Sequence, residues 1–308
     1  MKKLIKPAPL RKGQTIGIIA PCNGMSEAGI APAVEAIRSL GFEVKLGEHV
    51  FSRTDGYGGS AEERASDFNS MIADDSVSML LFPGGEIAIE SLPLIDYEAI
   101  KKHPKIICSY SDGTFPVEAV HSMTGLVTFY GGSTRTFDPV TEYNFARFTD
   151  CLVTGSTEYV KASEWRTVCP GRAEGVIAAG YLANYDTLLR SDYYSVPDED
   201  CILVIEDHEK FSDTRIVSRW LNDMIQKGAF EHATGLIFGH YTSDPEKLEK
   251  LFAVLRRIGE KMGIPVVYTD DFGHGANMSI FPVGIRAAFD TSDGSFRMFE
   301  AGVDTSIC

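Results

Sequence analysis

The chain has 308 residues, 44% of them hydrophobic and 23% charged, a composition typical of a soluble globular protein with two domains. A formal net charge of −14 argues against binding nucleic acid or an anionic membrane through a general electrostatic field. Lys6, Pro7 and Pro9 interrupt the apolar segment that a signal peptide would need near the N-terminus. No run in the sequence approaches the ~20 apolar residues of a membrane-spanning helix. We therefore expect a cytoplasmic protein without a signal peptide.

In the first half of the chain, strand and helix signals alternate. Ser26 is a candidate N-cap for a helix over residues 26–40, and Ser60 with Glu63 forms a capping-box pattern opening a helix over residues 60–73. The predicted strands are residues 15–20, 43–46, 77–82, 105–109 and 126–130. Repeated βα units favour a parallel sheet with helices on both faces, where ligands lie at the carboxyl ends of the strands.

The most informative stretch follows the predicted strand 105–109. Ser111 lies between this strand and a segment that can form a helix, which is the layout of a nucleophile elbow. Such a turn is crowded and needs small residues two before and two after the serine, and here these are Ser109 and Gly113. The alternative is that Ser111 and Asp112 only cap the following helix.

The second half of the chain begins after a stretch without a clear period, residues 151–171. We read that stretch as the crossing between domains, with an N-terminal domain over 1–150, a linker over 151–172 and a C-terminal domain over 173–308. The predicted strands here are residues 175–179, 201–205, 234–238, 265–268, 279–289 and 295–300. The predicted helices are residues 213–227 and 245–262.

A serine hydroxyl needs a general base, and that base needs an orienting acid. His274 is the best candidate base, because it lies in a glycine-flanked loop after an apolar strand; His208 is a rival. Glu206 is the candidate acid, since a purely apolar strand delivers it to a sheet edge, although it could simply be a solvated residue closing that strand. The backbone N–H groups of Asp112 and of the turn at Gly84-Gly85 are candidates for an oxyanion hole.

Metal and disulfide signals are weak. The seven histidines form no HxxxH or HExxH pair, which argues against a zinc hydrolase. The six cysteines are scattered without a CxxC pair, so we expect buried free thiols. Cys108 is a weak rival nucleophile because it lies inside an apolar strand.

The chain resembles the LD-carboxypeptidase family of serine peptidases, which includes the microcin C immunity carboxypeptidases. The order and spacing of several short segments over nearly the whole chain carry the resemblance. These segments are 13–21 (GQTIGIIAP), 63–69 (ERASDFN), 84–85 (GG), 104–106 (PKI), 110–114 (YSDGT), 124–129 (TGLVTF), 205–207 (IED), 235–239 (GLIFG), 273–274 (GH) and 281–284 (FPVG).

The resemblance implies a Ser-Glu-His triad of Ser111, Glu206 and His274, split between two domains. It also implies an oxyanion hole from the amides of Asp112 and Gly85. The implied fold is α/β, with a Rossmann- or flavodoxin-like parallel sheet in the N-terminal domain and a swivelling β/α C-terminal domain. The implied enzyme is a homodimer that uses no metal or cofactor.

The implied reaction is hydrolysis of an amide next to a free C-terminus, as in murein tetrapeptides, where an L-centre is joined to a terminal D-residue. The alternative substrate is a peptidyl- or aminoacyl-nucleotide, as in the immunity branch. An alternative of another class is a catalytically silent peptide-binding protein, and an α/β-hydrolase is a further one.

Departures from the family pattern bear on the substrate. Glu86 follows the Gly-Gly turn where murein enzymes often carry an aromatic residue, and Tyr181 replaces a small polar residue near the domain junction. The stretch around Trp165 resembles the immunity branch, which also carries a tryptophan there. The Trp165 indole could stack on a flat leaving group or simply pack the linker onto the core. Arg166 could pair with a substrate carboxylate.

Overall fold

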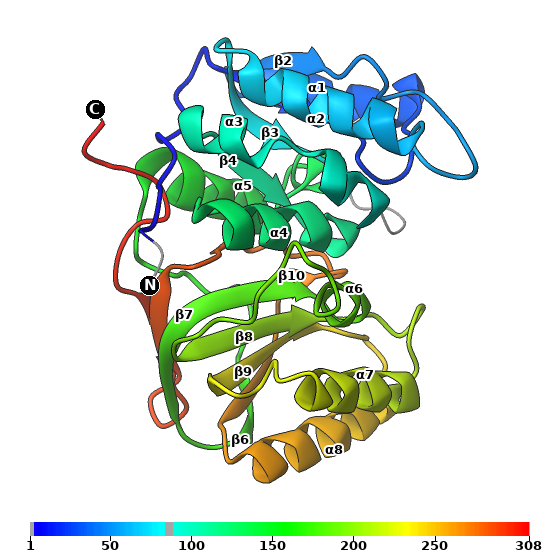
Figure 1. Ribbon diagram of the computed structural model, residues 1–308. Helices are drawn as coiled ribbons and strands as arrows, with labels where there is room; N and C mark the ends of the chain where they lie inside the picture. Colours follow the sequence, from blue (N-terminus) through cyan, green and yellow to red (C-terminus); the bar gives the residue numbers. More distant parts are fainter. Residues whose placement is uncertain (1–2, 84–88, 308) are drawn as a thin grey trace.

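The computed structural model describes residues 3–83 and 89–307, whose strands form two sheets in the upper and lower halves of Figure 1. The first sheet has the strand order β11-β5-β4-β3-β1-β2. Its strands are β1 (Thr15–Ile18), β2 (Glu43–Leu46), β3 (Val77–Leu81), β4 (Ile106–Ser109), β5 (Phe129–Tyr130) and β11 (Phe281–Pro282). Strands β1 to β5 are parallel, and β11 pairs antiparallel with β5. The order β2-β1-β3-β4-β5 is flavodoxin-like and brings the ends of neighbouring strands to one edge.

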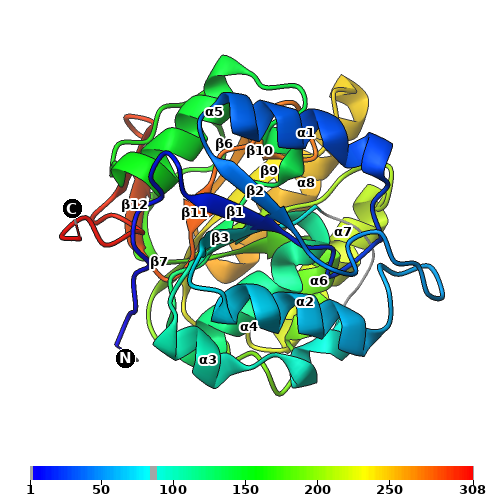
Figure 2. The same cartoon turned by 90° about the horizontal axis from the view of Figure 1, so that it is seen from above.

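Helices cover both faces of the first sheet, as Figure 2 shows. On one face lie α1 (Glu27–Ser39) and α5 (Glu142–Phe148), and on the other lie α2 (Ala61–Ala73), α3 (Tyr97–Lys102) and α4 (Thr114–Thr124). Ser26 caps α1 by accepting a hydrogen bond from the Gly29 amide. Ser60 and Glu63 form the predicted capping box of α2, so both predicted helix starts are confirmed.

The second sheet has the strand order β13-β12-β7-β8-β9-β10-β6. Its strands are β6 (Arg166–Cys169), β7 (Arg172–Tyr181), β8 (Cys201–Glu206), β9 (Ala233–His240), β10 (Val266–Gly273), β12 (Arg286–Asp290) and β13 (Ser295–Met298). Strands β7 to β10 are parallel, and antiparallel strands lie at both edges. The helices that accompany this sheet are α6 (Leu182–Leu188), α7 (Thr214–Gln226) and α8 (Pro245–Met262).

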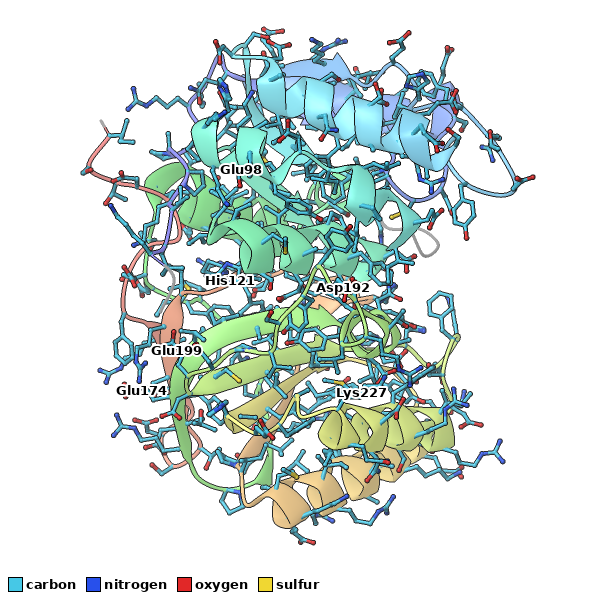
Figure 3. The ribbon with its side chains drawn as sticks, in the orientation of Figure 1. Glu98, His121, Glu174, Asp192, Glu199 and Lys227 are labelled. Carbon is cyan, nitrogen blue, oxygen red and sulfur yellow. The ribbon has the colours of Figure 1, made fainter. Side chains whose placement is uncertain are left out.

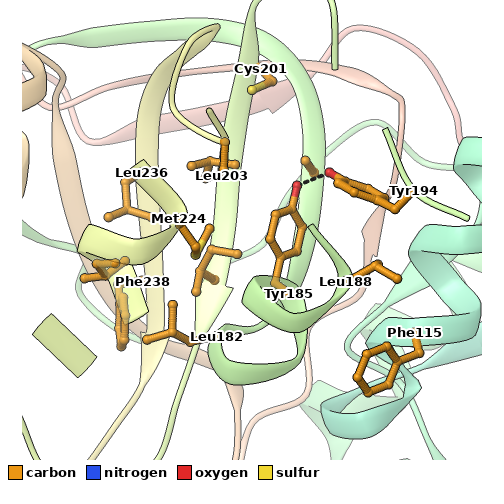
Figure 4. Packing of buried hydrophobic residues seen from close by; sticks show 14 of the residues in the cluster. Phe115, Leu182, Tyr185, Leu188, Tyr194, Cys201, Leu203, Met224, Leu236 and Phe238 are labelled. Atoms are coloured by element: carbon orange, nitrogen blue, oxygen red, sulfur yellow. Dashed lines mark hydrogen bonds between the residues drawn. The ribbon is translucent and has the colours of Figure 1, made fainter. Parts of the chain in front are cut away.

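The two sheets share a hydrophobic core through α4. Phe115 on α4 belongs to the same buried cluster as Leu182 on α6 and Leu203 on β8, and Figure 4 shows these side chains in one region. Within this cluster, the hydroxyl groups of Tyr185 and Tyr194 are hydrogen-bonded to one another. Burial of this apolar surface holds the two halves together at the edge where the carboxyl ends of β4 and β8 meet.

Several sequence predictions differ from the structure, among them the predicted strand 126–130, of which only Phe129–Tyr130 form β5. Residues 279–289 do not form one strand, because Gly284 has a φ of +86° and separates β11 from β12. Strand β10 extends past the predicted residues 265–268 to Gly273, so His274 follows a strand directly. The predicted linker contains β6, an edge strand stabilised by pairing with β10. The division into domains at 150 and 172 stays a prediction.

The cysteines of the described part of the chain are free and buried, as expected for Cys22, Cys108, Cys151, Cys169 and Cys201. Burial raises the pKa of the Cys108 thiol, which disfavours a reactive thiolate there. Among residues 3–83 and 89–307, no helix combines the length and the apolar character that crossing a membrane requires.

Candidate active site

Ser111 sits on a strained turn between β4 and α4. It begins a short 3₁₀ turn, η2 (Ser111–Gly113), and its φ of +56° lies in the left-handed region, which costs a non-glycine residue about 1–2 kcal/mol. A Cβ at Gly113 would lie 2.0 Å from the Oγ of Ser109. The sequence prediction that both flanking positions must be small is therefore confirmed. The Ser111 side chain bonds to an imidazole and not to the helix backbone.

Ser111, His274 and Glu206 are connected by two hydrogen bonds. The Nε2 atom of His274 lies 3.1 Å from the Oγ of Ser111, and its Nδ1 atom lies 2.7 Å from the Oε2 of Glu206. A neutral ring protonated on Nδ1 donates to the carboxylate and accepts from the hydroxyl, as a general base for the serine must. The three residues come from the ends of β4, β8 and β10, and thus from both sheets.

Gly273 allows His274 to approach Glu206. Its φ of +103° is a left-handed conformation that glycine adopts without strain. A Cβ at this position would lie 3.2 Å from the Oε2 of Glu206. The glycine before the histidine therefore has a steric role in the site.

Burial and charge act in opposite directions on the imidazole. Burial lowers the pKa of His274, while the charge and hydrogen bond of Glu206 raise it, and the net pKa is raised above the ordinary value. Glu206 has an exposed fraction of 0%, which excludes the alternative that it is a solvated residue closing a strand. A buried carboxylate beside His274 favours the protonated imidazole that forms when a base accepts a proton.

Tyr130 completes the hydrogen bonding of Glu206, and sequence reasoning missed it. Its hydroxyl donates to the Oε1 of Glu206 at 2.8 Å and accepts from the Ser111 amide at 3.1 Å. This fully buried residue ends β5, next to the strand that carries Ser111. The rule that parallel strands place functional groups at their carboxyl ends could have identified it.

Rings surround the imidazole of His274. The ring centroids of Tyr110, Tyr181, Phe211 and His208 lie 5.2, 5.4, 5.6 and 5.9 Å from its own centroid. Phe211 has an exposed fraction of 63%, which leaves an apolar face open to solvent beside the imidazole. The structure thus brings Tyr181, a predicted substrate contact, to the site.

His208 has a different environment from His274. Its Nδ1 accepts a hydrogen bond from the Lys210 amide at 3.0 Å. Burial and the nearby His274 and His240 lower the pKa of its imidazole. The structure pairs Ser111 with His274 and gives the rival histidine another partner.

Asp207, directly after Glu206, is also buried. Its Oδ1 accepts a hydrogen bond from the His208 amide at 2.7 Å. Burial raises the pKa of Asp207 to about 7. Among residues 3–83 and 89–307, no group of three or more His, Cys, Asp or Glu side chains is arranged to hold a metal ion.

Of the two backbone amides predicted to form the oxyanion hole, the structure describes that of Asp112. Asp112 lies in the turn that leads into α4, and its carboxylate accepts a hydrogen bond from the Asn184 amide group. The N–H of Asp112 is therefore at the N-terminal end of a helical segment, where backbone dipoles favour negative charge. Gly85 and the predicted substrate contact Glu86 lie outside the described residues.

Arg166 begins β6, the edge strand of the second sheet, and Trp165 directly precedes it. The Trp165 indole donates to the Oδ2 of Asp271 at 2.8 Å and packs on Tyr159 and Phe296. The Arg166 guanidinium lies 6.0 Å from the ring centroid of Phe252. The structure therefore gives both residues packing partners within the fold, and their contact with substrate stays a prediction.

The sequence matches a known protein family over most of its length. The family model of the LD-carboxypeptidase N-terminal domain matches residues 16–131, and that of the C-terminal domain matches residues 174–289. The "Probable murein peptide carboxypeptidase" of Bacillus subtilis is 31% identical, with 97% of this chain and 95% of that protein covered. The "Microcin C7 self-immunity protein MccF" of Escherichia coli is 26% identical over 97% of this chain and 96% of its own length.

Solved structures are similar over almost the whole chain. The MccF-like protein from Bacillus anthracis superposes with a TM-score of 0.87 at 25% identity, covering 96% of this chain and 98% of its own. MccF in complex with glutamyl sulfamoyl guanosine gives a TM-score of 0.85 at 24% identity, with 97% and 99% covered. These likenesses agree with the mixed α/β architecture described above.

Proposed function

Since this chain belongs to the LD-carboxypeptidase family, we propose that it is a serine-type carboxypeptidase with a catalytic triad of Ser111, His274 and Glu206. The observation that carries the proposal is the continuous hydrogen-bonded path from the Ser111 hydroxyl through His274 to the buried Glu206. These residues are distant in sequence and belong to two sheets, so their alignment needs the whole fold. The left-handed strain at Ser111 is a further feature of serine hydrolase sites.

In the proposed mechanism, Nε2 of His274 takes the proton from Ser111 as its oxygen attacks the scissile carbonyl carbon. Glu206 stabilises the resulting imidazolium, and the amides of Asp112 and Gly85 stabilise the oxyanion. The imidazolium then protonates the leaving amine as the C–N bond breaks, which leaves an acyl-enzyme. Water, deprotonated by His274, attacks the acyl carbon and releases the acid and the free serine.

We propose a murein tetrapeptide, cleaved between an L-centre and a terminal D-residue, as the substrate. The similarity to the murein peptide carboxypeptidase of B. subtilis supports this choice. No metal or cofactor takes part in the proposed mechanism. The homodimer that the resemblance implies remains a prediction, to be tested by analytical ultracentrifugation.

An aminoacyl-nucleotide is the second candidate substrate. The similarity to MccF supports it, because one MccF structure is described as a complex with glutamyl sulfamoyl guanosine. The exposed ring of Phe211 beside His274 offers a surface on which a nucleobase could stack. A catalytically silent peptide-binding protein is the alternative outside the enzymes.

The substrates can be separated by steady-state kinetics with purified protein. We expect release of D-alanine from a murein tetrapeptide, with a kcat/KM well above that for glutamyl sulfamoyl guanosine. Ser111→Ala should abolish turnover and leave the thermal midpoint almost unchanged, because Ser111 is partly held by backbone contacts that alanine keeps. Full activity in Ser111→Ala would refute the triad, and peptide binding without turnover in the unmodified protein would favour the binding-protein alternative.

A further inference from the structure

Arg135 places an exposed guanidinium beside the proposed triad. It lies in the 3₁₀ turn η3 (Thr134–Thr136), which follows β5 at the carboxyl edge of the first sheet. Ser111 follows β4, the neighbour of β5, so both residues emerge at the same edge. The side chain starts from the first sheet and reaches a residue that follows β10 in the second sheet.

Two hydrogen bonds hold the guanidinium at the junction of the two halves. Its Nη1 donates to the hydroxyl of Tyr110 at 2.9 Å, and its Nη2 donates to the carbonyl oxygen of Gly275 at 3.4 Å. Tyr110 directly precedes Ser111, and Gly275 directly follows His274. The positive charge is therefore tied to the chain next to both the proposed nucleophile and the proposed base.

The charge of Arg135 is not neutralised by an acidic side chain of the described chain. Within residues 3–83 and 89–307, no carboxylate lies within ion-pairing distance of this guanidinium, whereas the buried Arg64 and Arg147 pair with Glu90 and Asp150. A guanidinium has five N–H donors, and the two bonds above use two of those of this exposed residue. This geometry suits a carboxylate, which guanidinium binds through paired hydrogen bonds.

The molecule carries a net charge of −14, so an anionic substrate meets a generally unfavourable field. A local cation at the site would offset that repulsion where the substrate binds. Arg135 bonds to Gly275, which directly follows His274, the residue that protonates the leaving amine in the proposed mechanism. The guanidinium is therefore placed near the leaving-group side of the scissile amide. In a carboxypeptidase, the leaving amine carries the terminal carboxylate on the adjacent carbon.

We propose that Arg135 binds the C-terminal carboxylate of the substrate, on the leaving-group side of the scissile amide. Arg135 then restricts cleavage to the last residue of a peptide, because an internal amide has no carboxylate at that place. This inference deepens the proposed function and depends on it. It assigns to Arg135 the part that the sequence suggested for Arg166, whose guanidinium lies over Phe252.

The test compares two substrates that differ only at the carboxylate, a murein tetrapeptide with a free C-terminus and the same peptide as its C-terminal amide. Arg135→Ala should lower kcat/KM for the free acid by about 100-fold, the size expected for losing a charge-assisted bidentate contact. The amide should be cleaved slowly, and at nearly the same rate, by the unmodified enzyme and by the variant. Arg135→Lys, which keeps the charge but not the fork, should restore part of the loss on the free acid.

A structural role is separated by the same comparison. If Arg135 only fixes Tyr110 and Gly275, the Ala and Lys variants lose activity on both peptides by one common factor, which overturns the inference. Arg219→Ala is the matched control, because that exposed arginine lies over Trp220 on α7, and it should leave both rates unchanged.

Other outcomes also decide the matter. An unchanged preference for the free acid in Arg135→Ala overturns the inference, as does hydrolysis of glutamyl sulfamoyl guanosine alone, since its leaving group has no terminal carboxylate. Failure of the proposed function looks different, because Ser111→Ala would then keep the activity of the unmodified protein. If Arg135→Ala does not reach the thermal midpoint of the unmodified protein, Arg135→Lys and Arg135→Gln supply the comparison.

Discussion

Glu206 accepts two hydrogen bonds in the buried part of the site, from His274 at 2.7 Å and from Tyr130 at 2.8 Å. Because both oxygen atoms are occupied, the carboxylate cannot rotate without losing a partner. The hydroxyl of Tyr130 also accepts from the Ser111 amide, so one phenol connects the elbow to the acid. At the scale of single residues, the orientation of the proposed triad therefore depends on a tyrosine outside it.

Replacing Tyr130 by phenylalanine should lower kcat by about 10-fold, since an unpaired buried partner costs about 1–3 kcal/mol. The KM should change little, because Tyr130 is fully buried and offers no surface to substrate. The measurement is steady-state kinetics together with the thermal midpoint. Tyr97→Phe, which loses only a hydrogen bond to the Leu92 carbonyl, is the control and should keep full activity. Equal kinetics in both variants would contradict the positioning role.

The pH profile of kcat/KM reports the protonation of His274. Its pKa is raised because Glu206 outweighs burial, and the base is active only when neutral. Activity should therefore fall as the pH drops through a value above 6.5, the ordinary pKa of histidine. In Glu206→Gln, burial still lowers the pKa of His274, while the interaction with the Glu206 carboxylate that raises it is lost. The acid limb of the kcat/KM profile should therefore move to lower pH.

The same Glu206→Gln variant should lose about 10²–10⁴-fold in kcat, because the imidazolium is no longer stabilised by a carboxylate. Substrate binding away from the imidazole should be retained, so KM is the internal control. A Glu206→Gln profile whose acid limb coincides with that of the unmodified enzyme would argue against His274 as the titrating base.

At the scale of elements, the elbow between β4 and α4 depends on the close approach of two small residues. The Oγ of Ser109 donates to the carbonyl of Phe82 at 3.2 Å and occupies the space beside Gly113. Gly113→Ala would put a Cβ 2.0 Å from that Oγ and 2.4 Å from the Ser109 Cβ. The next nearest atom, in the Phe82 ring, is 3.4 Å away and leaves ordinary contact distance.

Gly113→Ala should therefore reduce the free energy of unfolding by about 1–3 kcal/mol and remove most activity, because the added methyl displaces the elbow. The double variant Ser109→Gly/Gly113→Ala removes both short contacts and should recover a large part of the activity. Urea unfolding and turnover are measured on the two single variants and the double variant. A purely additive loss would show that the Ser109–Gly113 contact does not control the turn.

At the scale of the whole molecule, α4 joins the two sheets by polar as well as apolar contacts. Thr114 accepts from the Tyr181 amide at 2.9 Å, and Glu118 accepts from the Ala179 amide at 2.7 Å. Glu118 also lines a cavity of about 630 Å³ at this seam, where Figure 3 shows His121 on the α4 side and Glu199 on the side of the second sheet.

Burial raises the pKa of Glu118 to about 8, so the folded protein keeps this carboxyl protonated at neutral pH. The unfolded chain releases that proton near the ordinary value of 4.5. Stability should therefore decrease as the pH rises between these two values, by up to about 1.4 kcal/mol per pH unit. Glu118→Gln removes this proton release and should be more stable than the unmodified protein by a margin that grows with pH.

Unfolding free energies from pH 5 to pH 8 measure this margin. Contributions from Asp207, whose pKa is also raised, are common to both proteins and cancel in the difference. Glu98→Gln is the control, because Glu98 is an exposed residue paired with Lys101, and its margin should stay flat. If the difference in unfolding free energy between Glu118→Gln and the unmodified protein also stays constant with pH, the Glu118 carboxyl is ionised in the folded protein.

The sequence predicts those features of the fold that depend on local patterns. Ser26 and Ser60 identify helix starts because capping is a contact between neighbouring residues. The end of β10 at Gly273 and the edge strand β6 depend on partners far along the chain, so no local pattern locates them. Repeated βα units predict a parallel sheet with helices on both faces, whereas the strand order β2-β1-β3-β4-β5 does not follow from them.

The proposed site divides in the same way. Ser111 is found from its crowded strand-to-helix turn, and His274 and Glu206 from their positions at strand ends. Tyr130 and Arg135 act through contacts between the two halves, with Glu206 and Gly275, which only the assembled molecule reveals. Residue type alone suggests substrate contacts for Trp165 and Arg166, and it does not show which surface each side chain faces, so those contacts stay predictions.

The proposed triad is tested most directly by covalent labelling with a serine-directed fluorophosphonate, followed by mass spectrometry of the digested protein. We predict one adduct per chain, on the peptide that contains Ser111, with no adduct in Ser111→Ala and a much slower reaction in His274→Ala. An unlabelled native protein, an adduct on another residue, or equal labelling of Ser111→Ala would contradict it.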